Sequence, residues 1–164
     1  MSGPGKTGPS ALAARLGAAL KAAGLTLAGS ESCTGGLAAK LLTDAPGSSE
    51  FFLGGVVAYS NAAKARLLRV RAGTLARHGA VSPETAREMA ENARRIFRSD
   101  YAFSVTGIAG PGGGSRSKPV GLVHFGFAHP GGTRLRRRVF PGSRARVRSA
   151  AAAFVFGELL KILE

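Results

Sequence analysis

Apolar residues recur along the chain at two spacings, and the two spacings alternate. Spacing of three to four residues, typical of helices, occurs over 11–23, 35–43, 61–68, 73–79, 83–95 and 143–159. Short apolar runs, typical of strands, occur over 25–30, 51–59, 101–105, 120–129 and 134–140. This alternation predicts an α/β protein: a three-layer α/β/α fold with a mixed five-stranded sheet, mostly parallel with one antiparallel strand.

Local signals refine these elements. Ser82 followed by Pro83 is typical of a helix start, and the loop 130–132 predicts a hairpin between the last two strands. The long apolar run over 51–59 indicates a buried strand. Alternating arginines in 134–140 indicate a solvated edge strand, because charges at a sheet edge deter aggregation.

Length and composition limit the class of protein. The 164 residues suffice for one domain with a substantial core, and 45% hydrophobic content excludes a wholly disordered chain. Residues 1–10 are mostly Gly, Pro, Ser and Lys, so we expect a disordered tail there and a single domain over 11–164. Neither a membrane-crossing run nor a secretory signal is visible, so we expect no membrane partner and a cytoplasmic location.

Cysteine, histidine and charge narrow the possible partners. One cysteine forms neither an internal disulfide nor a cysteine-based zinc site, and His78, His124 and His129 lack metal-ligand spacing. We therefore expect no metal and no other cofactor. A net charge of +14 would ordinarily favour nucleic acid, but the basic segment lacks interleaved aromatics and recognition motifs. We expect an anionic small substrate rather than specific nucleic-acid binding.

The turn after the first strand is the candidate site of chemistry. Residues 30–36 are small and polar, and a helix follows them. Unpaired N–H groups and the positive end of the dipole at a helix start favour an oxyanion or a phosphate. Ser32 is the candidate nucleophile in this turn. Ordinary helix capping would also explain these residue types. Whether Ser32 is a nucleophile or only part of a helix cap therefore depends on partner residues elsewhere in the chain.

A serine nucleophile needs a base, and a lysine kept neutral by burial is one solution besides histidine. Lys118 lies three residues after Ser115, but that spacing serves catalysis when the serine starts a helix, and here it lies in a glycine-rich loop. Lys64 is the better candidate. Parallel strands release their carboxyl ends at one edge, which places Tyr59 and Lys64 beside Ser32. The alternatives are a solvated lysine and a core-anchoring tyrosine.

Four motifs in order resemble the CinA C-terminal domain family, the nicotinamide-nucleotide amidases. They are E-S-C-T-G-G (31–36), Y-S-N-x-x-K (59–64), H-G-A-V-S (78–82) and T-G-I-A-G-P…K-P-V-G (106–121). The resemblance implies hydrolysis of nicotinamide mononucleotide to nicotinate mononucleotide and ammonia, in pyridine-nucleotide salvage. It also implies a metal-independent serine amidohydrolase with Ser32, Tyr59 and Lys64 as catalytic residues.

The resemblance further implies where the substrate binds. The implied substrate-binding residues are Cys33, Thr34, Gly35, Gly36, Asn61, Thr106, Gly107, Ala109, Gly110, Lys118 and Arg144. Among these, backbone N–H groups over 33–36 would stabilise the oxyanion, and Arg144 or Lys118 would hold the phosphate. Many relatives carry G-D-R where this chain has Gly142-Ser143-Arg144, so an acidic contact is missing.

Two alternatives of function stay open at this point. One is a non-catalytic nucleotide-binding or regulatory module, whose glycine loops would cradle phosphate without reaction. The other is hydrolysis of a different amide. Among macromolecular partners, we expect a second copy of the chain in a homo-oligomer.

Overall fold

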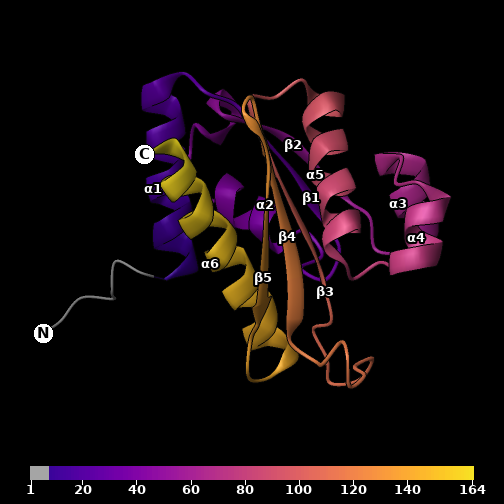
Figure 1. The fold of residues 1–164 in the computed structure, drawn as a ribbon. Coiled ribbons are helices and arrows are strands. Elements are labelled where there is room, and N and C mark those ends of the chain that lie inside the picture. The colour runs from indigo at the N-terminus through magenta and orange to yellow at the C-terminus, as the bar shows by residue number, and fades with distance from the viewer. Residues whose placement is uncertain (1–7) are drawn as a thin grey trace, which may run out of the picture.

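A computed structural model of the chain describes residues 8–164, and its centre is a five-stranded sheet (Figure 1). The strands are β1 (Leu27–Glu31), β2 (Phe52–Val57), β3 (Tyr101–Gly107), β4 (Leu122–His129) and β5 (Gly132–Val139), in the order β2-β1-β3-β4-β5. β1 pairs in parallel with β2 and β3, whereas β4 pairs antiparallel with β3 and β5. Of these strands, β4 therefore runs against the other four, which confirms the expected mixed sheet.

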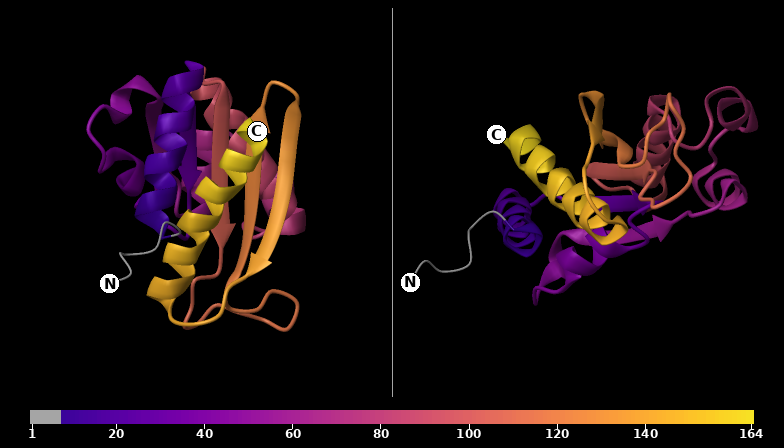
Figure 2. Two further views of the ribbon diagram at one scale, coloured as in Figure 1. Left: turned by 90° about the vertical axis from the view of Figure 1, so that its left-hand side faces the viewer. Right: turned by 90° about the horizontal axis from the view of Figure 1, so that it is seen from below.

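Helices cover both faces of the sheet. α1 (Pro9–Ala23), α2 (Leu37–Thr43) and α6 (Arg144–Leu163) pack together on one face. α5 (Pro83–Phe97) covers the other, with α3 (Asn61–Leu68) and α4 (Ala72–His78) beside it. A 3₁₀ turn, η1 (Ser48–Glu50), precedes β2. Figures 1 and 2 show the three layers, and the α/β/α prediction is confirmed.

The predicted helix starts agree with the caps observed. The Ser82 side chain accepts a hydrogen bond from the Thr85 N–H at the start of α5, and Ser143 caps α6 in the same way. α1 begins at Pro9, two residues before the expected boundary. Residues 1–7 of the expected tail lie outside the described residues.

One expectation about the sheet edges needs correction, and the other is confirmed. The strand expected to be buried, β2, is an edge strand with Leu53 and Val57 44% and 48% exposed, because only β1 pairs with it. β5 lies at the other edge with its arginines exposed or half-exposed, as expected, and two of them also contact α6. α6 crosses this face, so Arg136 Nε donates to Glu158 at 2.9 Å and the Arg138 guanidinium lies over the Phe154 ring.

The two faces of the sheet are filled differently. Phenylalanines including Phe103, Phe125 and Phe156 fill the space beneath α1 and α6. Smaller residues separate the sheet from α5, and a Cβ at Gly126 would lie 2.5 Å from the Ala86 carbonyl oxygen. Gly126 is therefore required by the close approach of α5 to β4.

The carboxyl ends of the three parallel strands β1, β2 and β3 lie side by side at one end of the sheet. The loop over 108–121 and the first turn of α6 lie at the same end, at the bottom of Figure 1. Within the described residues, no helix combines the length and hydrophobicity that crossing a bilayer requires.

Candidate active site

Ser32 is held at the end of β1 and is free of any capping role. Its N–H donates to the Val105 carbonyl of β3 at 2.9 Å, which extends the parallel ladder by one residue. The preceding residue, Glu31, is 2% exposed and accepts the N–H groups of Gly36, Ala38 and Ala39 at 2.8–3.1 Å. Because this carboxylate caps α2, the Ser32 hydroxyl is left for other contacts.

The Lys64 amine lies against Ser32. Lys64 lies in the first turns of α3 and its side chain turns inward, where the residue is 1% exposed. Its Nζ lies 2.8 Å from Ser32 Oγ, 3.0 Å from the Ala58 carbonyl oxygen and 3.1 Å from the Tyr59 carbonyl oxygen. Chain folding thus joins two side chains that are 32 residues apart in sequence.

Burial controls the protonation of Lys64. Loss of water around the amine lowers its pKa below the ordinary 10.5, while the neighbouring Cys33 acts weakly in the opposite direction. No carboxylate of the described residues forms an ion pair with it. Cys33 is itself buried, and burial raises the pKa of its thiol to about 11, so it stays protonated near neutral pH.

Tyr59 contacts the pair through its backbone rather than its ring. Its carbonyl oxygen accepts from Lys64, whereas the residue is 60% exposed and its phenol oxygen accepts a hydrogen bond from the Arg144 guanidinium at 2.9 Å. Arg144 also donates to the Gly110 carbonyl oxygen at 2.9 Å. This arginine, in the first turn of α6, therefore links the tyrosine to the glycine-rich loop.

A cavity of about 270 Å³ opens above Ser32 and Lys64. Nine of the residues expected in the site line it: Ser32, Cys33, Tyr59, Lys64, Thr106, Gly107, Ala109, Gly110 and Arg144. The cavity therefore gathers the ends of β1, β2 and β3 with the start of α6, as the sheet topology predicts.

Five expected substrate-binding residues do not line the cavity: Thr34, Gly35, Gly36, Asn61 and Lys118. The N–H groups of Gly35 and Gly36 already donate to the Ser32 carbonyl and to Glu31, so neither is directed at the cavity. Lys118 instead donates to the His78 carbonyl oxygen at 2.8 Å. Among the described residues of this turn, Cys33 and Thr34 have N–H groups for which the structure gives no acceptor.

Sequence reasoning missed several residues of the site. Ala80 and Val81 line the cavity, and the Ala80 carbonyl oxygen accepts a hydrogen bond from Thr106 Oγ1 at 2.7 Å. The H-G-A-V-S motif contains both residues, so it was the available signal. Glu31 was also visible in its motif, but only the structure reveals the three N–H groups that it accepts.

The other candidate groups lie apart from this cavity. His124 is buried on β4, and burial together with the charges of Arg137 and Lys118 lowers its pKa, so it is neutral near pH 7. The Ser115 hydroxyl accepts the Lys118 N–H and does not contact the lysine amine. Across residues 8–164, no three His, Cys, Asp or Glu side chains are grouped as metal ligands would be.

Comparison with known proteins places this geometry in a family. The CinA C-terminal domain model matches residues 9–163. The chain is 51% identical to the nicotinamide-nucleotide amidohydrolase PncC of Escherichia coli K12 over 90% of both chains. It is 53% identical, over 88% of its length, to a putative competence-damage inducible protein of Caldanaerobacter subterraneus subsp. tengcongensis, of which it spans 35%.

A solved structure agrees with the sequence comparisons. The competence/damage inducible protein CihA from Agrobacterium tumefaciens superimposes with a TM-score of 0.93 at 40% identity, covering the whole of both chains. The expected resemblance is thereby confirmed in sequence and in fold. The chain belongs to the CinA C-terminal domain family.

Proposed function

We propose that this protein is a serine amidohydrolase that converts nicotinamide mononucleotide to nicotinate mononucleotide and ammonia. The identity of 51% with a protein named for this activity, over nine tenths of both chains, supports the choice of substrate. The contact of 2.8 Å between Lys64 Nζ and Ser32 Oγ supports the choice of mechanism. That contact is the observation that carries the proposal.

The surroundings of Lys64 suit a neutral amine. A neutral amine has two N–H donors and one lone pair, and a carbonyl oxygen can only accept. In the neutral form, the Ala58 and Tyr59 carbonyl oxygens accept the two N–H groups at 3.0 and 3.1 Å, and the lone pair then accepts the proton of the Ser32 hydroxyl 2.8 Å away. Burial without a carboxylate partner favours the same form, and Lys64 can then act as the general base.

The first half of the reaction forms an ester on Ser32. The Ser32 oxygen attacks the carboxamide carbon while Lys64 takes its proton, and the carbonyl oxygen becomes an oxyanion. The N–H group of Cys33, which lines the cavity, is the candidate to stabilise that oxyanion, and such a donor contributes about 3 kcal/mol. Lys64 then returns the proton to the leaving nitrogen, the carbon–nitrogen bond breaks, and ammonia departs.

The second half restores the enzyme. A water molecule gives its proton to Lys64 and attacks the ester carbon, and the Ser32 oxygen leaves and recovers the proton. The products are the carboxylate of nicotinate mononucleotide and free Ser32. Because Lys64 gains and loses one proton in each half, the cycle needs no metal and no cofactor.

The cavity has room for part of the substrate. Its volume of about 270 Å³ is at the lower end of sites that enclose a small ligand. We expect it to hold the pyridine ring and its carboxamide, with the ribose and phosphate at the exposed rim beside Tyr59. Arg144 at that rim can bind the phosphate through its guanidinium, and the N-terminus of α6 adds to the attraction.

Ammonia release from nicotinamide mononucleotide by the purified chain tests the proposal. Wild type should release ammonia with multiple turnovers, and Ser32→Ala should lower kcat by at least a thousandfold while the melting temperature stays unchanged. Ser115→Ala removes an exposed hydroxyl outside the cavity, and its kcat should equal that of wild type.

Other outcomes separate the alternatives. Binding of the nucleotide by wild type without ammonia release would favour a non-catalytic module. Ammonia release from other carboxamides in a panel, but not from this nucleotide, would favour a different amide substrate. Full activity of Ser32→Ala would remove the assigned nucleophile.

A further inference from the structure

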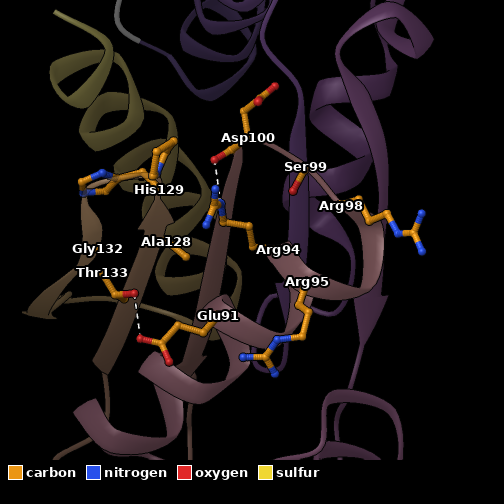
Figure 3. Close-up of a pocket in the computed structure, with 11 residues that line it drawn as sticks. Glu91, Arg94, Arg95, Arg98, Ser99, Asp100, Ala128, His129, Gly132 and Thr133 are labelled. Carbon is orange, nitrogen blue, oxygen red and sulfur yellow. Dashed lines mark hydrogen bonds between the residues drawn. The ribbon is translucent and has the colours of Figure 1, made fainter.

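A second and larger cavity lies at the opposite end of the sheet. Its volume is about 660 Å³, and it lies between the carboxyl end of α5 and the hairpin that joins β4 and β5 (Figure 3). It reaches Asp100 just before β3 starts, whereas the first cavity reaches Gly107 where β3 ends. Thr106 also lines the first cavity, and it lies six residues beyond Asp100 along the strand, or about 20 Å. The proposed amidase reaction does not use this cavity.

Three arginines line the cavity without a carboxylate partner among the described residues: Arg94, Arg95 and Arg98. Arg94 donates through Nε to the Asp100 carbonyl oxygen at 2.8 Å, and in Figure 3 its guanidinium lies between Asp100 and His129. Arg95 and Arg98 are exposed and extend in other directions from the end of α5. Because exposed arginines change rotamer easily, both can turn towards a bound anion.

The two carboxylates of the cavity are engaged elsewhere. Glu91 accepts a hydrogen bond from Thr133 Oγ1 at 2.8 Å and lies 3.6 Å from Arg87. Asp100 accepts both the N–H and the hydroxyl of Thr26 at 2.7–2.8 Å. Neither carboxylate forms an ion pair with the three arginines, so the lining keeps an excess of positive charge.

His129 adds an uncharged polar group to the lining. Its Nδ1 accepts the Gly131 N–H at 3.1 Å, and its ring stacks on Tyr101 at 6.2 Å. Burial and the neighbouring charges of Arg134 and Arg94 lower its pKa, so the ring is neutral and Nε2 carries the proton. That N–H is a further donor for an anion.

The helix dipole alone does not explain this arrangement. Cations in the last turn of a helix offset its negative end, and this accounts for Arg94 and Arg95. Arg98 follows the helix in a left-handed conformation, φ 52°, which a non-glycine residue seldom adopts. Neither fact explains why a cavity of ligand size adjoins the arginines.

We propose that this cavity binds a small molecule that carries phosphate groups. A guanidinium has the planar donor geometry that matches phosphate oxygens, and three arginines line this one cavity, of which Arg95 and Arg98 would turn their guanidinium groups towards the bound phosphate. The volume falls within the roughly 300–1,000 Å³ of small-molecule sites, which favours a compact ligand over a polymer lying across the surface.

Calorimetric titration of the full chain with inorganic pyrophosphate tests the site. At low ionic strength, wild type should bind pyrophosphate, and the double variant Arg95→Gln/Arg98→Gln should weaken the affinity at least tenfold. Arg94→Gln should weaken it at least as much. If Arg94→Gln lowers the melting temperature through loss of its bond to Asp100, the double variant still decides, because Arg95 and Arg98 make no hydrogen bond to another element of the described structure.

A matched control removes the same charge elsewhere. Arg15→Gln/Arg77→Gln replaces two exposed arginines that line neither cavity, and its affinity should stay within twofold of wild type. An equal loss in both double variants would indicate diffuse attraction and overturn the proposal. Absence of binding to wild type at millimolar pyrophosphate, or loss of binding in Arg144→Gln alone, would overturn it as well.

Discussion

At the scale of single residues, the decisive feature is a lysine taken out of water without a counter-ion. Lys64 is 1% exposed, and its nitrogen contacts only oxygens that are uncharged: two carbonyls and one hydroxyl. A charged amine in such a position loses its hydration and gains no ion pair in return. The fold therefore favours the form of Lys64 that can accept a proton.

The first prediction follows from that lowered pKa. The ratio kcat/KM for nicotinamide mononucleotide should rise with pH through the pKa of Lys64 in the folded protein, because only the neutral amine accepts the Ser32 proton. Lys64→Met should lower kcat at least a thousandfold at every pH. Initial rates of ammonia release from pH 6 to 10 provide the measurement.

The same group should contribute to the pH dependence of stability. Between its lowered native pKa and 10.5, the unfolded chain binds more protons at this position than the native chain, so stability should rise with pH. The difference in free energy of unfolding between wild type and Lys64→Met, measured in urea, should therefore move in favour of wild type over this window. A constant difference would mean that Lys64 keeps its ordinary pKa.

At the scale of elements, α2 depends on the residue that ends the preceding strand. A helix of seven residues is too short to be stable by itself. Glu31 stabilises it by accepting three N–H groups at its start, and this also fixes the turn that carries Ser32. Strand, turn and helix therefore form one unit in which Ser32, the proposed nucleophile, is positioned by its own neighbour.

Glu31→Gln should destabilise this unit. The amide brings N–H donors against backbone N–H groups and removes the charge, so we expect a loss of about 1.5–3 kcal/mol in the free energy of unfolding. kcat should fall as Ser32 loses its fixed position, whereas nucleotide binding at Arg144 should be less affected. Urea denaturation and steady-state kinetics measure the two effects.

Asp44→Asn at the other end of α2 is the control for this variant. Its pair with Lys40 is solvent-exposed, with side chains 47% and 66% accessible, so the variant should change stability by less than about 1 kcal/mol. Equal effects at the two ends of the helix would contradict the capping role of Glu31.

At the scale of the whole molecule, one buried carboxylate ties a helical layer to the sheet. Glu158 of α6 accepts hydrogen bonds from Arg136 of β5 at 2.9 Å and from Lys161 at 2.8 Å. Burial opposes ionisation of this carboxyl, but the hydrogen bonds and charges of Lys161 and Arg136 outweigh it and lower the pKa below 4.5. The layer is thus attached more firmly when Glu158 is charged.

Glu158→Gln should therefore cost stability in a pH-dependent way. A lowered carboxyl pKa contributes stability that is present above 4.5 and is lost as the pH falls through the native value. We expect about 1–3 kcal/mol at pH 7, shrinking towards zero in acid, from urea denaturation at pH 3 to 7. Glu50→Gln, at an exposed pair with Lys21, is the control and should show no such trend.

Much of the architecture could be predicted from the sequence, and the failures have a common cause. The periodicity of apolar residues placed every helix and strand within a few residues, because burial on one face is a local pattern. The same periodicity could not show that β2 is an edge strand, because an apolar run such as 52–57 is compatible with the centre of a sheet as well as with its edge. Nor could it show that α6 would cross β5 and engage its arginines.

The sequence by itself determined which side chains were available for chemistry, and it placed Ser32 at the end of one strand and Lys64 in the helix that follows a neighbouring parallel strand. Only the tertiary structure decided which of them lie in contact. In the folded chain the amine of Lys64 is buried and contacts the Ser32 hydroxyl, and the carboxylate of Glu31 caps the start of α2. The phenol of Tyr59 contacts Arg144, which is 85 residues away in sequence. The hydration of a side chain and its distance from other side chains depend on elements that are far apart along the chain. A local pattern of residues therefore cannot predict either quantity.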